Sequence, residues 1–141
     1  MLRAGLLSIV LLVLPVLAVA GELVMAAHPS ISQHHISRNF ARTIFGMRAQ
    51  QWPDGSSIRV FVLPDNHPLH AAFSKEVLNL FPHQLRTAWD RQVYSGTGQA
   101  PSEVRSEEEM MSRIASTPGA IGYVSRNNVN EYKVRIVEVR P

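Results

Sequence analysis

The sequence of 141 residues contains no cysteine. Disulfide bonds and thiolate metal clusters are therefore excluded, and so is a small extracellular module framed by disulfides. Charge is also scarce, because 14 Lys and Arg against 11 Asp and Glu give a formal net charge of only +3, with no basic run. Nucleic acid is a poor candidate partner, since its recognition needs a concentrated basic surface.

Common catalytic motifs are absent as well. The sequence has no G-x-S-x-G, no H-E-x-x-H and no cysteine nucleophile. The three adjacent acidic residues Glu107, Glu108 and Glu109 fan around a predicted helix start and do not face one another. We therefore expect a protein that is not an enzyme and that uses no cofactor.

One long hydrophobic run is present, at the N-terminus. Arg3 precedes an apolar stretch over Leu6–Leu17, and Ala18-Val19-Ala20 has the A-x-A form of a cleavage site. A membrane span needs about 20 apolar residues, so the shorter run favours a cleaved signal peptide (residues 1–20) over an anchor. We expect residues 21–141 to form a single exported domain, and the lack of cysteine favours the bacterial periplasm.

The remaining chain is organised around the stretch Ile36–Gly55. Ser37 is the expected N-cap of a short amphipathic helix, because its hydroxyl can accept from a free N–H of the first turn. Gly46 is expected to end this helix by adopting a positive φ, and a Trp-Pro-Asp-Gly turn follows. The apolar stretch Ile58–Leu63 then predicts a strand that is buried on both faces.

A first strand is predicted over Leu23–Ala27. If this strand and Ile58–Leu63 run parallel, the helix between them forms a right-handed crossover. Three helices and two strands follow in the predicted order. The whole pattern predicts the α/β class, with a small, largely parallel sheet flanked by helices.

The later elements have clear boundary signals. Pro68 and Pro82 are each suited to the first position of a helix, and the second of these helices is expected to bury Val93 beside its other apolar residues. Ser106 and Glu109 form a capping box at the start of the last helix. A glycine in the next strand, Gly122, indicates close approach by a neighbouring group. The final strand, 132–139, carries alternating charges and is expected at an edge of the sheet.

Three stretches in this order carry a resemblance to a known family: ISRNFARTIFGMRAQQWPDG, VFVLPDNHPLHAAF and SEEEMMSRIASTPGAIGYVS. They resemble one lobe of the phosphate-binding periplasmic proteins of ABC transporters, which have the type II periplasmic-binding fold. The resemblance covers about Leu23–Ser125. It implies an exported protein that binds phosphate or a related oxyanion for an ABC transporter.

The resemblance also implies what this chain lacks. Full-length members hold ligand between two lobes, and this chain has room for one. In the family, the loop after the second strand carries an arginine and then Ser-Gly-Thr, positions that hold Leu63 and His67-Pro68-Leu69 here when aligned on Phe73. The literal Ser95-Gly96-Thr97 follows a helix and is not that loop. We therefore expect weak oxyanion binding.

The residues around the helix start at Pro68 are the expected ligand site, because free N–H groups at a helix N-terminus attract anions. Asn66 can cap this helix, and Asp65 can accept from a protonated oxyanion. The helix start at Ser37 is a second candidate on the same sheet edge. The alternative is that these residues only cap helices and that the histidines are solvated. The candidate ligands are Ser37, Arg38, Asp65, Asn66, His67 and His70.

Two further hypotheses stay open. In one, the lobe has lost its ligand and serves as a periplasmic protein-interaction or sensor-accessory module that docks on a membrane transporter or sensor component. In the other, the histidines near the first strand (His28, His34, His35) converge with His67 and His70 to carry a metal. We favour exposed loop histidines and no metal, because a site needs three or four converging ligands. Oligomerisation is compatible with each hypothesis.

Overall fold

The computed structural model describes residues 5, 22–131 and 133–141. The expected signal peptide lies outside the described residues, apart from Gly5. The elements in chain order are β1 (Leu23–Ala27), β2 (His35–Ser37), α1 (Arg38–Phe45), β3 (Arg59–Val62), α2 (Pro68–Ala72), the π-helical η1 (Phe73–Val77), α3 (Pro82–Ser95), β4 (Ser102–Glu103), α4 (Glu107–Ser116), β5 (Ala120–Ser125), the 3-10 helix η2 (Arg126–Glu131) and β6 (Arg135–Arg140). Across the described part, no helix combines the length and apolarity that a membrane span requires.

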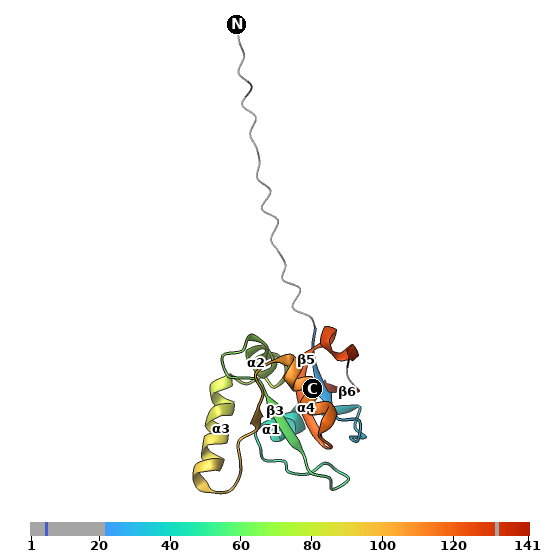
Figure 1. Cartoon of the computed structure of the whole chain (residues 1–141). Helices are drawn as coiled ribbons and strands as arrows, with labels where there is room; N and C mark the ends of the chain where they lie inside the picture. Colours follow the sequence, from blue (N-terminus) through green and yellow to red (C-terminus); the bar gives the residue numbers. More distant parts are fainter. Residues whose placement is uncertain (1–4, 6–21, 132) are drawn as a thin grey trace.

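The strands form one six-stranded sheet in the order β2-β6-β1-β5-β3-β4 (Figure 1). Three neighbouring pairs are parallel (β2 with β6, β3 with β4, β3 with β5), whereas β1 is antiparallel to both β5 and β6. The predicted α/β class with a largely parallel sheet is confirmed.

The predicted crossover between β1 and β3 is wrong. The strand β5 lies between them and is antiparallel to β1 but parallel to β3, so β1 and β3 run in opposite directions. The chain leaves β1 through a connector that ends in the short strand β2, which pairs with β6 on the far side of β1. The helix α1 therefore joins the unpredicted β2 to β3, two strands that run in the same direction, and does not join β1 to β3.

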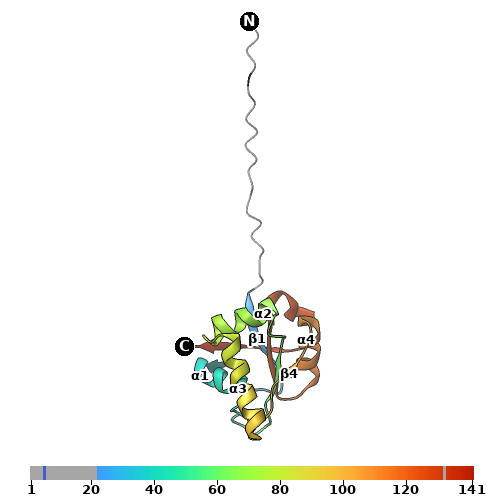
Figure 2. The same cartoon turned by 90° about the vertical axis from the view of Figure 1, so that its left-hand side faces the viewer.

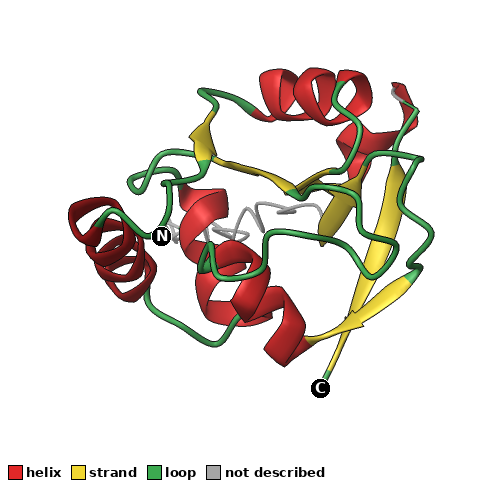
Figure 3. Ribbon diagram, turned by 90° about the horizontal axis from the view of Figure 1, so that it is seen from below, coloured by secondary structure: helices red, strands yellow, loops and turns green. Residues whose placement is uncertain are grey.

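Helices cover both faces of the sheet (Figures 2 and 3). On one face α4 packs directly over Gly122 of β5: a Cβ on this glycine would lie 2.5 Å from Met110 Sδ and 2.9 Å from Ile114 Cδ1. The close approach predicted at Gly122 is thus confirmed. Successive strand residues point to opposite faces, so the adjacent Tyr123 faces the other layer, where it stacks on Phe73 of η1 with ring centroids 4.0 Å apart.

The capping predictions for two helices are confirmed. Ser37 Oγ accepts from the N–H of Phe40 at 3.0 Å and begins α1. Ser106 Oγ accepts from the N–H of Glu109 at 3.1 Å, and the Glu109 carboxylate accepts from the N–H of Arg105 at 2.9 Å. These side chains satisfy donors that a helix cannot satisfy internally.

Gly46 ends α1 as expected, but its predicted positive φ is wrong. Its φ is −77°, and Met47 carries the positive φ of 63°. Glycine is required there for space, since a Cβ would lie 2.8 Å from the carbonyl oxygen of Arg42.

Two predictions about burial are also wrong. Val93 is 48% exposed, because α3 is fully buried only at Leu85 and Trp89 and its last turn extends past the core. The final strand β6 lies between β2 and β1 and not at an edge. The edges are the two shortest strands, β2 and β4, whose two or three residues give no periodicity to detect.

Candidate functional site

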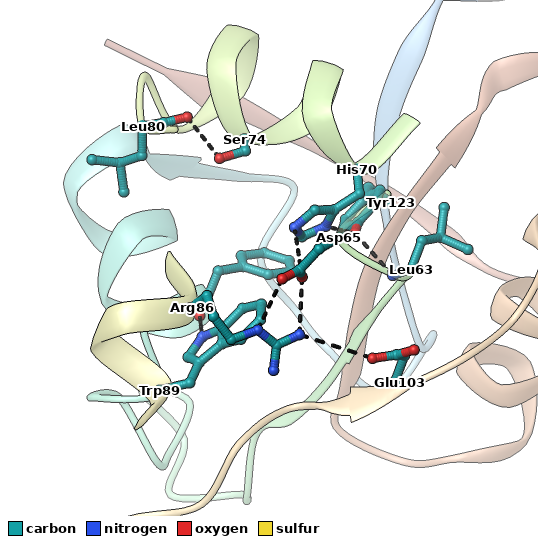
Figure 4. A network of polar contacts seen from close by, with 10 residues as sticks. Leu63, Asp65, His70, Ser74, Leu80, Arg86, Trp89, Glu103 and Tyr123 are labelled. Atoms are coloured by element: carbon teal, nitrogen blue, oxygen red, sulfur yellow. Dashed lines mark hydrogen bonds and ion pairs between the residues drawn. The ribbon is translucent and has the colours of Figure 1, made fainter. Parts of the chain in front are cut away.

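The loop between β3 and α2 follows the C-terminal end of β3, and it carries a polar network (Figure 4). Asp65 in this loop forms a bidentate pair with Arg86 of α3: Nε to Oδ2 and Nη2 to Oδ1 are both 2.9 Å. The Glu103 carboxylate lies 4.0 Å from Arg86 Nη2, and the guanidinium lies 5.0 Å from the centroid of Trp89. The hydrogen bonds from Arg86 lower the pKa of Asp65.

Beneath this pair lies a chain of buried polar groups. The side chains of His70 and Tyr123 are fully buried. Tyr123 Oη accepts from the N–H of Leu63 at 2.9 Å and also contacts His70 Nδ1. Burial raises the pKa of Tyr123 and lowers that of His70, the latter against the opposing effect of the Asp65 carboxylate.

The imidazole of His70 has two buried nitrogens. Nδ1 contacts Tyr123 Oη, which has one proton and two lone pairs and can therefore donate to Nδ1 or accept from it. His70 Nε2 is buried, has no hydrogen-bond partner among the described residues, and lies 3.8 Å from Asp65 Oδ1. The site thus places a buried imidazole nitrogen close to a half-exposed carboxylate.

The start of α2 is closed by its own residues. His67 is the N-cap, and its Nδ1 accepts from the N–H of Leu69 at 3.1 Å. The carbonyl oxygen of His67 accepts from the N–H of His70 at 3.0 Å, and Pro68 has no N–H. The prediction that Asn66 caps this helix is wrong, and the expected free N–H groups of the first turn are already bonded.

The predicted ligand residues lie in two separate places. Asp65, the exposed Asn66, His67 and His70 surround the start of α2. Ser37 and Arg38 lie at the start of α1, where Arg38 Nε donates to the carbonyl oxygen of Val77 at 3.1 Å. The strands β2 and β3 run in the same direction, so their C-terminal ends lie on the same side of the sheet, as expected. Three strands, β6, β1 and β5, lie between them. One small oxyanion therefore cannot contact both groups.

The proposed convergence of histidines is wrong. His28 follows β1 and His34 precedes β2. Both therefore lie at the N-terminal end of β3, on the side of the sheet opposite the Asp65 loop. His70 is buried and therefore not a solvated loop histidine. Within the described ranges, no three His, Cys, Asp or Glu side chains come together in a way that could hold a metal ion.

Sequence reasoning missed Arg86, Glu103 and Tyr123 as members of the network. Arg86 lies three residues before Trp89, a spacing that puts it beside the buried stripe of α3, so its proximity to the core was detectable. Nothing local connects it to Asp65, 21 residues away. Tyr123 sits 53 residues from His70 and reads from the sequence as an ordinary packing residue.

The solved structures of known proteins identify the fold. No protein-family model and no curated protein sequence matches the chain. An ABC-type phosphate transport receptor from Vibrio cholerae superposes with a TM-score of 0.65 at 12% identity, over 84% of this chain and 46% of that one. PstS from Borrelia burgdorferi gives 0.66 at 19% identity, over 85% and 47%.

A further match is a putative phosphate ABC transporter substrate-binding protein with bound phosphate, from Clostridium perfringens, with a TM-score of 0.65 at 16% identity over 84% and 45%. The chain thus spans less than half the length of each of these proteins. It has the fold of one half of the phosphate-binding proteins of ABC transporters, as the resemblance in the sequence predicted. At these identities the likeness establishes the fold.

Proposed function

We propose that this domain is one half of an oxyanion-binding unit, exported through residues 1–20 and linked to an ABC transporter. The observation that supports it is the coverage: the match takes in 84–85% of this chain but only 45–47% of the three phosphate-transport proteins. Ligand pockets lie preferentially between domains and enclose most of their ligand. A second domain must close over the start of α2 before an oxyanion is enclosed.

On its own, the domain binds an oxyanion weakly. The first-turn N–H groups of α2 are bonded internally, and Arg86 is paired with Asp65. Two carboxylates, Asp65 and Glu103, surround the single guanidinium, so the local charge disfavours a dianion. The available group is the half-exposed Asp65 carboxylate, which can accept from a protonated oxygen. The closing domain supplies the remaining donors.

Titration of the ¹⁵N-labelled protein with inorganic phosphate tests this function. We expect saturable amide shifts at Asp65, Asn66 and His67 in the millimolar range. Sulfate at the same ionic strength is the control and should bind more weakly, because it offers no proton to a carboxylate. Submillimolar binding, or saturable shifts confined to other residues, would contradict the proposal.

The second candidate is an interaction module without a ligand. The closed start of α2 favours it, and so do the exposed apolar side chains at the two ends of α3: Phe81, Val93 and Tyr94 are 57%, 48% and 88% exposed. Contiguous exposed apolar side chains mark docking surfaces, and Val93 and Tyr94 are adjacent in the last turn of α3. If phosphate causes no shift and a pull-down from periplasmic extract recovers the same partner with and without phosphate, this function replaces the first. Loss of that partner in Tyr94→Ser would place the contact on α3.

A further inference from the structure

The two nitrogens of the buried His70 face different partners (Figure 4). On one side Nδ1 contacts Tyr123 Oη. On the other side Nε2 has no hydrogen-bond partner among the described residues and lies 3.8 Å from Asp65 Oδ1. A neutral imidazole carries one proton, whereas an imidazolium donates from both nitrogens. Protonation of either neutral tautomer therefore leaves a charged N–H on Nε2, slightly beyond hydrogen-bond distance of a carboxylate oxygen.

An arginine already uses the same carboxylate oxygen. Arg86 Nη2 donates to Asp65 Oδ1 at 2.9 Å. A second carboxylate oxygen, Glu103 Oε2, lies 4.0 Å from this Nη2. The distances from His70 Nε2 to Asp65 Oδ1 and from Arg86 Nη2 to Glu103 Oε2 are thus each only about 1 Å longer than a hydrogen bond between charged groups. A small displacement is enough to exchange the partners of both donors.

Burial decides which of these groups moves. The imidazole of His70 packs against Trp89 and Tyr123, with ring centroids 6.2 and 5.8 Å away. The side chains of Asp65 and Arg86 are each 40% exposed. The imidazole is therefore held in place by its neighbours, whereas the carboxylate and the guanidinium have room to shift.

Titratable and charged groups surround His70 from several parts of the fold. They are Asp65 and His67 before α2, Arg86 of α3, Glu103 of β4 and Tyr123 of β5. Burial lowers the pKa of His70 most strongly, and the Asp65 carboxylate opposes this effect. Arg86 and His67 lower the pKa of His70 further. Asp65 is thus the neighbour that favours the imidazolium.

We propose that His70 is a pH sensor that switches the contacts of the Asp65 loop. When the imidazole is protonated by solvent, Asp65 Oδ1 leaves Arg86 and accepts from His70 Nε2. The released Nη2 of Arg86 donates to Glu103. The switch runs in this direction because a buried imidazolium needs a counterion, while the guanidinium has a second carboxylate within reach. At low pH the loop is therefore bonded to α2, and α3 is bonded to β4.

The switch also changes the charge next to the start of α2. With a neutral imidazole, the two carboxylates and the guanidinium of Asp65, Glu103 and Arg86 carry one net negative charge, and an imidazolium at His70 cancels it. An oxyanion is then repelled less, so a lower pH should favour its binding. This consequence rests on the proposed function, whereas the exchange of partners does not and is tested without ligand.

NMR titration of the ¹⁵N,¹³C-labelled protein from pH 8 to pH 5, without phosphate, tests the switch. Carboxyl groups with an ordinary pKa of about 4 stay ionised over this range, so a common step belongs to a histidine. The signals to follow are the imidazole nitrogens of His70, the carboxyl carbons of Asp65 and Glu103 and the Nε–H of Arg86. We expect all of them to change with one midpoint, below the ordinary histidine pKa of 6.5.

Two substitutions with opposite effects distinguish the switch from a structural role. Glu103→Gln weakens the alternative partner of Arg86 and should lower the midpoint of His70 by about 0.5 pH unit, the size expected for a half-exposed ion pair. Arg86→Gln removes the competitor for Asp65 Oδ1 and should raise the midpoint by a similar amount. The matched control Glu108→Gln, at an exposed glutamate of α4, should leave it unchanged. Circular dichroism checks that each variant is folded.

The proposal is overturned if His70 stays neutral down to pH 5, or if its imidazole titrates while the signals of Asp65 and Arg86 do not follow. It is equally overturned if Glu103→Gln and Arg86→Gln shift the midpoint in the same direction, or if Glu108→Gln shifts it as much as Glu103→Gln does. Because the titration contains no phosphate, failure of the switch leaves the proposed function standing, and failure of phosphate to bind leaves the switch standing.

Discussion

Replacement of Tyr123 by phenylalanine removes one buried oxygen and tests the polar chain that joins β3, β5 and α2. The oxygen accepts from the N–H of Leu63 and contacts His70 Nδ1. In Tyr123→Phe both partners stay buried without it. The ring can remain stacked on Phe73, where the centroids are 4.0 Å apart, so the apolar packing is retained.

The magnitude follows from the two groups that lose their partner. A buried donor or acceptor left unsatisfied costs about 1–3 kcal/mol, so the loss of the shared partner of two such groups should lower the free energy of unfolding by about 2–6 kcal/mol. That is a large part of the about 5–15 kcal/mol typical of a domain. The effect should appear as a lower urea midpoint with an unchanged m-value, since the surface exposed on unfolding is nearly the same.

Urea denaturation followed by circular dichroism measures the effect. Tyr94→Phe is the matched control: this side chain is 88% exposed, and its loss of a hydroxyl should change stability by less than about 0.5 kcal/mol. His70→Phe and the double variant complete a cycle, in which the two changes should be non-additive by about 1 kcal/mol or more. A stability of Tyr123→Phe equal to that of the wild type, or strict additivity in the cycle, would refute the hydrogen-bonded network of Leu63, Tyr123 and His70.

Two more stability predictions follow from single residues. Gly122→Ala should lower the free energy of unfolding by about 1–3 kcal/mol in the same urea assay, because its methyl group would lie 2.5 Å from Met110 Sδ; an unchanged midpoint would contradict the close packing of α4. Burial lowers the pKa of His70 below its ordinary 6.5, so the unfolded chain takes up the proton first and stability should fall as the pH drops below about 6.5. His70→Gln should flatten this dependence in urea titrations between pH 8 and 5, whereas the exposed His83→Gln should not.

The sequence predicted the elements that have local signals. Ser37 and Ser106 cap their helices because a hydroxyl and the first-turn N–H groups are only three residues apart. The five-residue apolar strand β1 has the predicted bounds. Gly122 marked the close packing of α4, since a glycine inside an otherwise apolar strand usually has a spatial cause.

The sheet order could not be predicted, since it depends on pairings between distant residues. Leu23 pairs with Ser125, and His35 pairs with Glu138. The strands β2 and β4 are too short for a periodic pattern. The antiparallel pairing of β1 with β5, which excludes a crossover from β1 to β3, has no local signal either. Strand register across such separations is set by tertiary packing.

Four of the predicted ligand residues lie around the start of α2, but the contacts that they make were not predicted. Asp65 was predicted as an acceptor for ligand, yet Arg86 of α3 occupies both of its oxygens. His70 was assigned to solvent or ligand and is buried against Tyr123. Both differences arise from partners more than 20 residues away, which spacing along the chain does not reveal.

The affinity of the isolated domain for inorganic phosphate tests the central claim most directly. Calorimetric titration at pH 7 should give a dissociation constant weaker than about 1 mM, which corresponds to a binding free energy smaller than about 4 kcal/mol. The reason is that the first-turn N–H groups of α2 and the guanidinium of Arg86 are already bonded within the domain. Submillimolar binding by the monomer would contradict the account.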